Sequence, residues 1–303
     1  MTHPITSGDN KAIRDRMLNL MRQGLHRTSA TNIIFVCGGD GHQHLRPKFI
    51  DYMADELSEY LPFRPEAAQT DYFEQDHEDT LNLSQFEELI SDLSLGIVLF
   101  AESPGSYAET GLFSALENAR KKTLVILDQI HQGPGSFLAF GPVATITAKS
   151  RLGAAVQMDF NHPNFALVRD RIRDRLPVPS TRKAIGEKSF SDLEPQEIMA
   201  FIWFIVSTLK ACSFDDVMFL MNGLFEARAS DARVRQILSV MVGAGLLVRE
   251  GPINLIRIAR PDIVLVEPSK AFETKAGELA LEITNVLEDS GDANYMEAMA
   301  HVG

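Results

Sequence analysis

Cysteine is scarce in this chain of 303 residues, which contains only Cys37 and Cys212. The two thiols lie far apart in the sequence, so they supply neither a disulfide framework nor the closely spaced ligands of a structural metal site. Proteins of the reducing cytoplasm typically have this pattern. We therefore expect a cytoplasmic protein without a bound metal.

Long apolar runs are also missing. No segment approaches the ~20 consecutive apolar residues that a membrane-spanning helix needs. The N-terminal stretch MTHPITSGDNKAIRDRM contains no apolar signal core. Neither membrane insertion nor export is expected.

Basic residues are outnumbered, with 29 Lys and Arg against 41 Asp and Glu, which gives a formal net charge of −12. Such a chain repels nucleic acid on average. Any contact with nucleic acid must therefore use a local basic patch.

Buried strands alternating with amphipathic helices fill residues 30–180 and predict an α/β domain built on a parallel sheet, with helices on both faces. A separate amphipathic helix is expected within residues 1–29, and Pro177-Val178-Pro179 marks a boundary before a second domain over 181–303. The predicted strands are 32–37, 61–65, 96–101, 123–128, 143–147 and 155–158. The predicted helices of this domain are 45–60, 84–93, 106–121 and 164–176.

A glycine-rich turn, Gly38-Gly39-Asp40-Gly41, follows the first of these strands. Glycines at such a position let backbone N–H groups come close to a phosphate or a ribose. A tight strand-to-helix turn would need the same residues. Gly38, Gly39 and Asp40 are thus candidate substrate-binding residues, with the turn as the alternative interpretation.

A second turn, Ser103-Pro104-Gly105-Ser106, follows the strand 96–101 and opens a helix. Small residues at the carboxyl end of a parallel strand are typical of a binding site in this class of fold. Ser103, Gly105 and Ser106 are therefore candidate substrate-binding residues.

Two carboxylates lie beside this turn, Glu102 and Glu109. Ser106-x-x-Glu109 fits a capping box, in which Glu109 would only satisfy the start of its helix. Alternatively, Glu109 is a nucleophile that attacks an anomeric carbon, and Glu102 is the acid that protonates the leaving group. Glu102 could equally be a solvated acid at the strand end.

Two motifs, FVCGGDGHQH (residues 35–44) and LFAESPGSYAETGLFSAL (residues 99–116), resemble those of the nucleoside deoxyribosyltransferase-like effector proteins of retron defence systems. The resemblance implies a Rossmann-like domain over about residues 30–160, followed by a winged helix. In the wider deoxyribosyltransferase family the glutamate at this helix start takes the sugar at C1′, a role that falls on Glu109. Many of those enzymes have an aspartate where this chain has Ser103, so the acid is not assigned by the resemblance.

The resemblance also implies a toxin that acts on a nucleotide or an NAD-like substrate and is restrained by a reverse transcriptase and its DNA–RNA hybrid. No cofactor is expected. Either water or another base could accept the sugar. A non-catalytic module that senses a nucleotide is the alternative function.

The region 181–303 has the order of a winged helix, with predicted helices at 193–209, 214–225 and 231–246 before a hairpin of 246–249 and 255–258. A last helix is expected at 270–288, with frayed residues after it. Arginines concentrate on the third helix and the hairpin, where winged helices meet phosphates. The candidates for nucleic-acid contact are Arg228, Arg233, Arg235, Arg249 and Arg257.

Winged helices also bind proteins, and these arginines could instead form a solvated helix face or pair with acids of another subunit. The N-terminal helix and the C-terminal arm are plausible assembly elements of a homo-oligomer. Trp203, the only tryptophan, lies in an apolar helix and is expected in the core.

Overall fold

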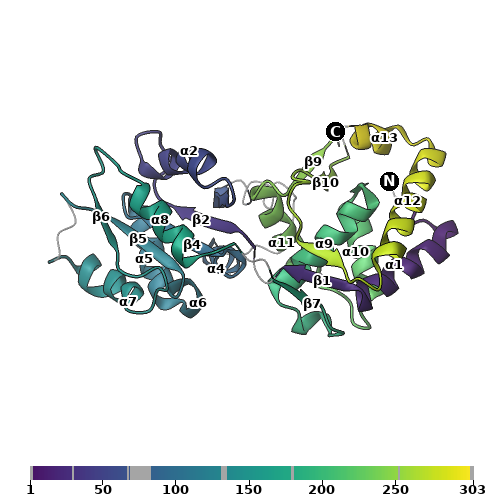
Figure 1. Ribbon diagram of the computed structural model, residues 1–303, viewed down its shortest axis with the longest axis horizontal. Coiled ribbons are helices and arrows are strands. Elements are labelled where there is room, and N and C mark those ends of the chain that lie inside the picture. The colour runs from purple at the N-terminus through teal and green to yellow at the C-terminus, as the bar shows by residue number, and fades with distance from the viewer. Residues whose placement is uncertain are drawn as a thin grey trace. The chain divides into compact units, whose positions relative to one another are not determined.

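A computed structural model describes residues 3–28, 31–66, 68, 83–130, 135–178, 181–251 and 253–300 (Figure 1). The chain divides into two compact units. The first contains residues 31–65 and 83–178, and the second contains residues 3–28 and 181–300 together with residues 66 and 68. The N-terminal segment thus belongs to the same unit as the C-terminal part of the chain. None of the helices in the described ranges is both long and apolar enough to cross a membrane.

The first unit is built on a five-stranded sheet in the order β3-β2-β4-β5-β6. Every neighbouring pair is parallel, for example Phe35 opposite Ile97 between β2 and β4, which confirms the predicted parallel sheet. Its strands are β2 (Ile33–Cys37), β3 (Leu61–Phe63), β4 (Gly96–Phe100), β5 (Thr123–Asp128) and β6 (Val156–Met158).

Helices cover both faces of this sheet. One face of the sheet carries Val98 and Phe100 of β4. It packs against α2 through Phe49 and Met53 and against α8 through Val168 and Ile172. The opposite face meets α5, where the ring of Phe113 lies 5.8 Å from that of Phe35. The helical elements are α2 (Leu45–Glu56), α4 (Leu83–Leu93), α5 (Pro104–Ala115), α6 (Glu117–Arg120), the π-helical η2 (Ala139–Val143), α7 (Ala144–Thr147) and α8 (Ala166–Arg175).

The predicted strand over 143–147 is wrong, because these residues continue η2 into α7. Val143 and Ile146 are buried, and their spacing of three places both on one face of a helix. The run is too short for its apolar pattern to separate a helix from a strand.

The second unit contains two small antiparallel sheets. One has the order β11-β1-β7 and the other the order β8-β10-β9, in which β9 and β10 form the predicted hairpin. The strands are β1 (Leu25–Thr28), β7 (Arg182–Ala184), β8 (Ala211–Cys212), β9 (Leu247–Glu250), β10 (Leu255–Ile258) and β11 (Val266–Pro268).

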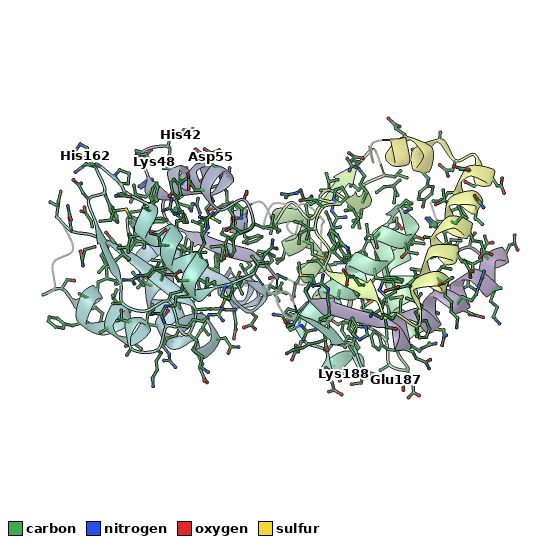
Figure 2. The ribbon with its side chains drawn as sticks, in the orientation of Figure 1. His42, Lys48, Asp55, His162, Glu187 and Lys188 are labelled. Atoms are coloured by element: carbon green, nitrogen blue, oxygen red, sulfur yellow. The ribbon has the colours of Figure 1, made fainter. Side chains whose placement is uncertain are left out.

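Helices make up most of the second unit, and α9 is buried along almost its whole length, including Trp203 as expected. Figure 2 shows the side chains that fill the spaces between the elements of each unit. The residues after 290, expected to fray, form a further helix in their described part. The helical elements are η1 (Gly8–Asn10), α1 (Lys11–Gln23), η3 (Phe190–Asp192), α9 (Pro195–Leu209), α10 (Phe214–Leu224), α11 (Asp231–Gly243), α12 (Glu273–Ser290) and α13 (Ala293–Ala300).

Lys122, just before β5, provides a pH test of the first unit. Its Nζ donates to the carbonyl oxygens of Ser94 at 2.7 Å and Asp92 at 3.3 Å, and burial lowers its pKa from 10.5 to about 8. Between these two pH values the unfolded chain holds a proton that the folded chain has lost, so the free energy of unfolding rises with pH.

We expect Lys122→Met to flatten this rise, measured by hydrogen exchange of the β4 and β5 amides between pH 8 and 10.5. Lys121→Met is the matched control, because Lys121 is exposed and paired only with Glu117 among the described residues. Equal slopes for wild type and Lys122→Met would contradict the assignment.

Candidate functional site at the carboxyl ends of β2 and β4

The two turns singled out in the sequence lie at the topological switch point of the sheet. From β2 the chain crosses to β3 on one side, and it then returns to β4 on the other side of β2. Ligands of open α/β sheets bind outside the carboxyl ends of the strands at such a point. Gly38–Asp40 follows β2 and Glu102–Ser106 follows β4, so the fold brings both motifs to this edge.

The carboxylate of Glu102 joins the end of β4 to the start of α2. Oε1 accepts the backbone N–H groups of Gly39 at 3.0 Å and Arg46 at 3.2 Å, and Oε2 accepts that of Leu45 at 2.7 Å. The imidazole Nδ1 of His44 lies 3.5 Å from Oε2, and the Glu102 side chain is only 5% exposed. Glu102 therefore supplies the cap that α2 needs, because the N-cap residue His44 makes no side-chain cap bond.

This carboxylate explains the two glycines of the first turn. A Cβ at position 38 would lie 2.7 Å from Oε1 of Glu102 and 2.9 Å from Cβ of Arg46. A Cβ at position 39 would lie 2.3 Å from the ring of His44. The close approach of Glu102, Arg46 and His44 thus explains why the tight turn has glycine at positions 38 and 39. Contact of Gly38 and Gly39 with a substrate stays a prediction.

Asp40 extends from the same turn into solvent, with 78% of its side chain exposed. Its Oδ1 accepts from Nη2 of Arg46 at 2.6 Å, and the Arg46 side chain is 3% exposed. Asp40 is therefore available to a ligand while a buried cation fixes its position. Sequence reasoning missed Arg46, because nothing in the sequence indicated that an arginine in the first turn of α2 would be buried.

The helix α5 begins three residues earlier than the capping-box pattern suggested. Ser103 is the N-cap, and its Oγ accepts the N–H of Ser106 at 3.2 Å, while Oγ of Ser106 accepts the N–H of Ser103 at 2.9 Å. The interpretation of Glu109 as the cap partner of Ser106 is therefore wrong. The buried hydroxyl of Ser106 also accepts the N–H of Glu102 at 3.0 Å, so it holds the turn together.

Glu109 lies in the second turn of α5. Positions 106, 109 and 113 form one stripe of the helix, and both Ser106 and Phe113 are buried. The Glu109 side chain is half-buried and its Oε2 atom is buried. Gly105 lies at the exposed start of the helix, where an added Cβ would have the Oγ of Ser103 at 3.9 Å as its nearest neighbour. Glu109 thus lies on the inward face of the helix that starts at the switch point.

A further carboxylate, missed in the sequence, ends the next strand. Asp128 is the last residue of β5, is 7% exposed and accepts the N–H of Ile130 at 3.0 Å. Its place at the carboxyl end of a parallel strand was the signal that could have found it. In the part of the chain that the structure describes, no three metal-ligating side chains gather into a site.

The five arginines predicted to meet nucleic acid have different surroundings. Arg257 forms a two-pronged ion pair with Glu250, is 16% exposed and has a raised pKa because of that pair. The guanidinium of Arg235 stacks 3.5 Å from the ring centre of Phe214. Arg228 is 77% exposed, with Asp231 at 3.6 Å. Arg233 and Arg249 are each half-buried.

Comparison with known proteins gives two findings. The sequence profile of the family described as "STM3845 retron effector protein" matches residues 42–280, more than half of the chain. A protein of Escherichia coli named "Retron Ec86 putative ribosyltransferase/DNA-binding protein" is 34% identical over 128 residues, which is 41% of each chain. The match thus covers about two fifths of that relative's length.

The role of Glu102 in the fold can be tested by Glu102→Gln. Whichever of the two carboxylate oxygens the amide NH₂ replaces, it would face a backbone N–H at the start of α2. That N–H group would then have no acceptor. We expect a loss of about 1–3 kcal/mol in the local stability of this helix end. Hydrogen exchange at Gly39, Leu45 and Arg46 measures it.

Glu88→Gln on the exposed side of α4 is the control for the same chemical change. Unchanged exchange at all three amides in Glu102→Gln would show that the carboxylate does not hold α2.

Proposed function

This chain belongs to the STM3845 retron effector family, and we propose that its first unit breaks the N-glycosidic bond of a nucleotide or an NAD-like molecule, with Glu109 as the nucleophile. The observation that carries the proposal is that Ser103, and not Ser106, is the N-cap of α5. This start leaves Glu109 outside the cap and on the inward stripe of the helix, beside the switch point.

The chemistry requires a carboxylate that can reach an anomeric carbon. An oxygen of Glu109 forms a bond to C1′ while the C1′–N bond breaks and its electron pair leaves with the base. Water then attacks C1′ of the resulting ester, gives one proton to solvent and restores the carboxylate. A second base in place of water would make the reaction a transfer. Asp40, Ser103 and Gly105 would bind the sugar and phosphate of the substrate.

Glu102 is better suited to positioning than to acid catalysis. Both of its oxygens already accept backbone N–H groups, and its side chain is almost fully buried. A nicotinamide leaving group carries a positive charge before cleavage and departs as a neutral base without a proton. A substrate of this kind therefore fits a site in which Glu102 is occupied, and it favours an NAD-like molecule over a purine nucleotide.

The second unit would link this activity to its control. Within it, the helices α9, α10 and α11 precede the β9–β10 hairpin, which is the order of a winged helix. The relative's name includes DNA binding. We propose that this unit is a winged helix that meets the DNA–RNA hybrid of the retron, and that the hybrid and its reverse transcriptase restrain the enzyme.

Glu109→Gln tests the chemistry directly. We expect base release from NAD or from nucleotides, followed by chromatography, to fall at least ~10³-fold, because an amide is a poor nucleophile. Glu117→Gln, an exposed carboxylate on α6, should cleave like wild type.

Cleavage by Glu109→Gln at the wild-type rate would refute the assignment. Stabilisation of both proteins by a nucleotide, with no product from either, would favour the non-catalytic sensing module.

Arg228→Ala tests the nucleic-acid contact. We expect affinity for a DNA–RNA hybrid to fall severalfold, and the slope of log Kd against log salt to lose about one unit, because one phosphate contact is removed. Arg16→Ala, which removes an exposed arginine paired with Glu282 in the same unit, is the control. An unchanged salt slope in Arg228→Ala would exclude Arg228 from the interface.

A further inference from the structure

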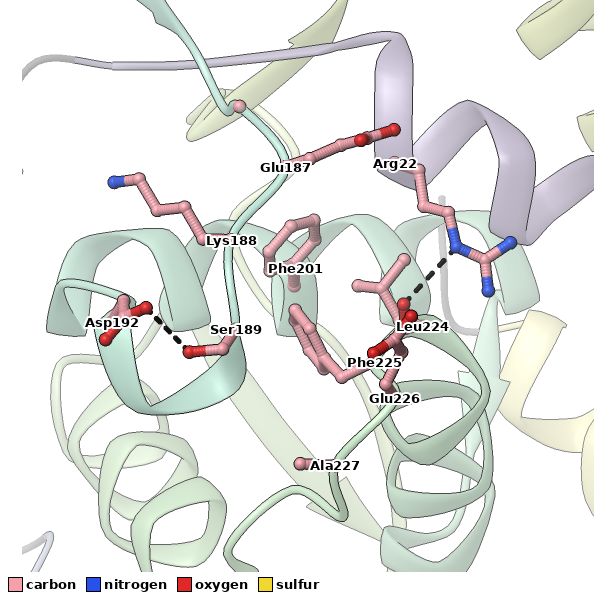
Figure 3. A pocket seen from close by; sticks show the side chains of 11 residues that line it. Arg22, Glu187, Lys188, Ser189, Asp192, Phe201, Leu224, Phe225, Glu226 and Ala227 are labelled. Carbon is pink, nitrogen blue, oxygen red and sulfur yellow. Dashed lines mark hydrogen bonds between the residues drawn. The ribbon is translucent and has the colours of Figure 1, made fainter.

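A pocket of about 670 Å³ opens in the second unit, separate from the residues of the candidate catalytic site (Figure 3). Its walls come from the end of α1, the segment that leads into α9, α9 itself and the end of α10. The lining residues that bear on a ligand are Arg22, Glu187, Lys188, Phe201, Phe225 and Glu226. Its volume is in the range of pockets that hold small ligands or short peptide segments.

Aromatic rings form the apolar part of this pocket. Phe201 is buried and Phe225 is half-buried, and their ring centres lie 6.0 Å apart in an edge-to-face arrangement. The ring centre of Phe190 lies 5.6 Å from that of Phe225, also edge-to-face. Because three rings hold one another in place, the pocket offers a fixed apolar surface to a ligand.

The cations and the hydroxyl of the pocket are already engaged within the protein. Nζ of Lys188 lies 2.8 and 3.0 Å from the two oxygens of Glu197, a buried carboxylate. Arg22 donates to the carbonyl oxygens of Gly223 and Leu224 at the end of α10. The charge of Lys188 is therefore balanced by Glu197, whereas Arg22 is held by neutral carbonyl groups and keeps its positive charge.

Two carboxylates of the pocket are not engaged in this way. Glu187 and Glu226 are both exposed, and neither forms a hydrogen bond or an ion pair with any residue that the structure describes. Figure 2 shows Glu187 at the surface of the unit. In the view of Figure 3, Glu187 lies above the rings of Phe201 and Phe225, and Glu226 lies beside the lower of the two rings. The lining thus carries three carboxylates, Glu187, Asp192 and Glu226, against the two cations Arg22 and Lys188. Its net charge is negative, as is that of the whole chain.

We propose that this pocket binds a basic segment of a protein partner. A lysine or arginine of that segment enters with its apolar stem on the Phe201–Phe225 pair and its charge toward Glu187 and Glu226. Such a side chain matches both surfaces, because its stem packs on apolar atoms and its head is attracted by ring faces and by carboxylates. A nucleic acid fits less well, because its phosphates would face the two carboxylates.

The proposal concerns binding by the second unit, so it does not depend on the chemistry assigned to Glu109. The test is selection of a random-peptide phage library on the full chain, followed by fluorescence anisotropy with synthetic peptides of the selected consensus. We expect the consensus to contain Lys or Arg beside apolar residues. Glu187→Lys/Glu226→Lys should weaken the binding of these peptides at least tenfold, and more at low salt.

Matched variants separate the contacts of the pocket from net charge and from folding. Glu288→Lys/Asp289→Lys makes the same charge change at exposed positions of α12 and should leave binding within about twofold of wild type. Phe225→Leu keeps an apolar side chain but removes the ring face, and should weaken binding about two- to fivefold. Thermal unfolding of each variant shows whether it is folded.

Three results would overturn the proposal. The first is a library consensus that is absent or acidic. The second is a basic consensus that binds Glu187→Lys/Glu226→Lys as tightly as wild type. The third is oligodeoxythymidylate binding that Phe225→Leu weakens, which would assign the pocket to single-stranded nucleic acid instead.

Discussion

The arrangement of the candidate site depends on one residue, Glu102, whose side-chain carboxylate and backbone N–H both form hydrogen bonds. Its carboxylate accepts three backbone N–H groups from the turn after β2 and the start of α2. Its own backbone N–H is accepted by the hydroxyl of Ser106 in the turn after β4. The two turns that border the switch point are therefore connected through a single residue, and neither can move without breaking bonds to it.

This arrangement separates the roles of two carboxylates that the sequence presents as a pair. Glu102 is immobilised and almost wholly buried, which suits a group that fixes the geometry around it. Glu109 lies one helical turn beyond the Ser103–Ser106 cap and takes no part in that cap. The nucleophilic role proposed for Glu109 rests on this position on the inward stripe of α5.

The sequence predicted the elements whose signal is local, and it failed where partners come from distant segments. The buried runs of β2, β4 and β5 and the β9–β10 hairpin were found because their patterns are complete within a few residues. The strands β1, β7 and β11 were missed because each is short and pairs with a segment more than 150 residues away. The role of Glu102 was missed for the same reason, since its partners precede it by 56–63 residues. The start of α5 was misplaced because the serines at 103 and 106 both fit an N-cap, and only the backbone decides between them.

The N-terminal segment looked like an accessory helix in the sequence, but contacts along its whole described length make it part of the second unit. The backbone N–H of His3 bonds to Asp216, and burial lowers the pKa of its imidazole, whose Nδ1 accepts the N–H of Ile5. Further along, Arg22 covers the carbonyl end of α10, and the buried Arg27 pairs with Glu194. Because β1 is the central strand of its sheet, removal of this segment would leave β7 and β11 without a partner. In the sequence, the first unit is thus inserted into the second between β1 and β7, which pair with each other. The pocket brings Arg22 of the N-terminal segment together with residues that follow β7.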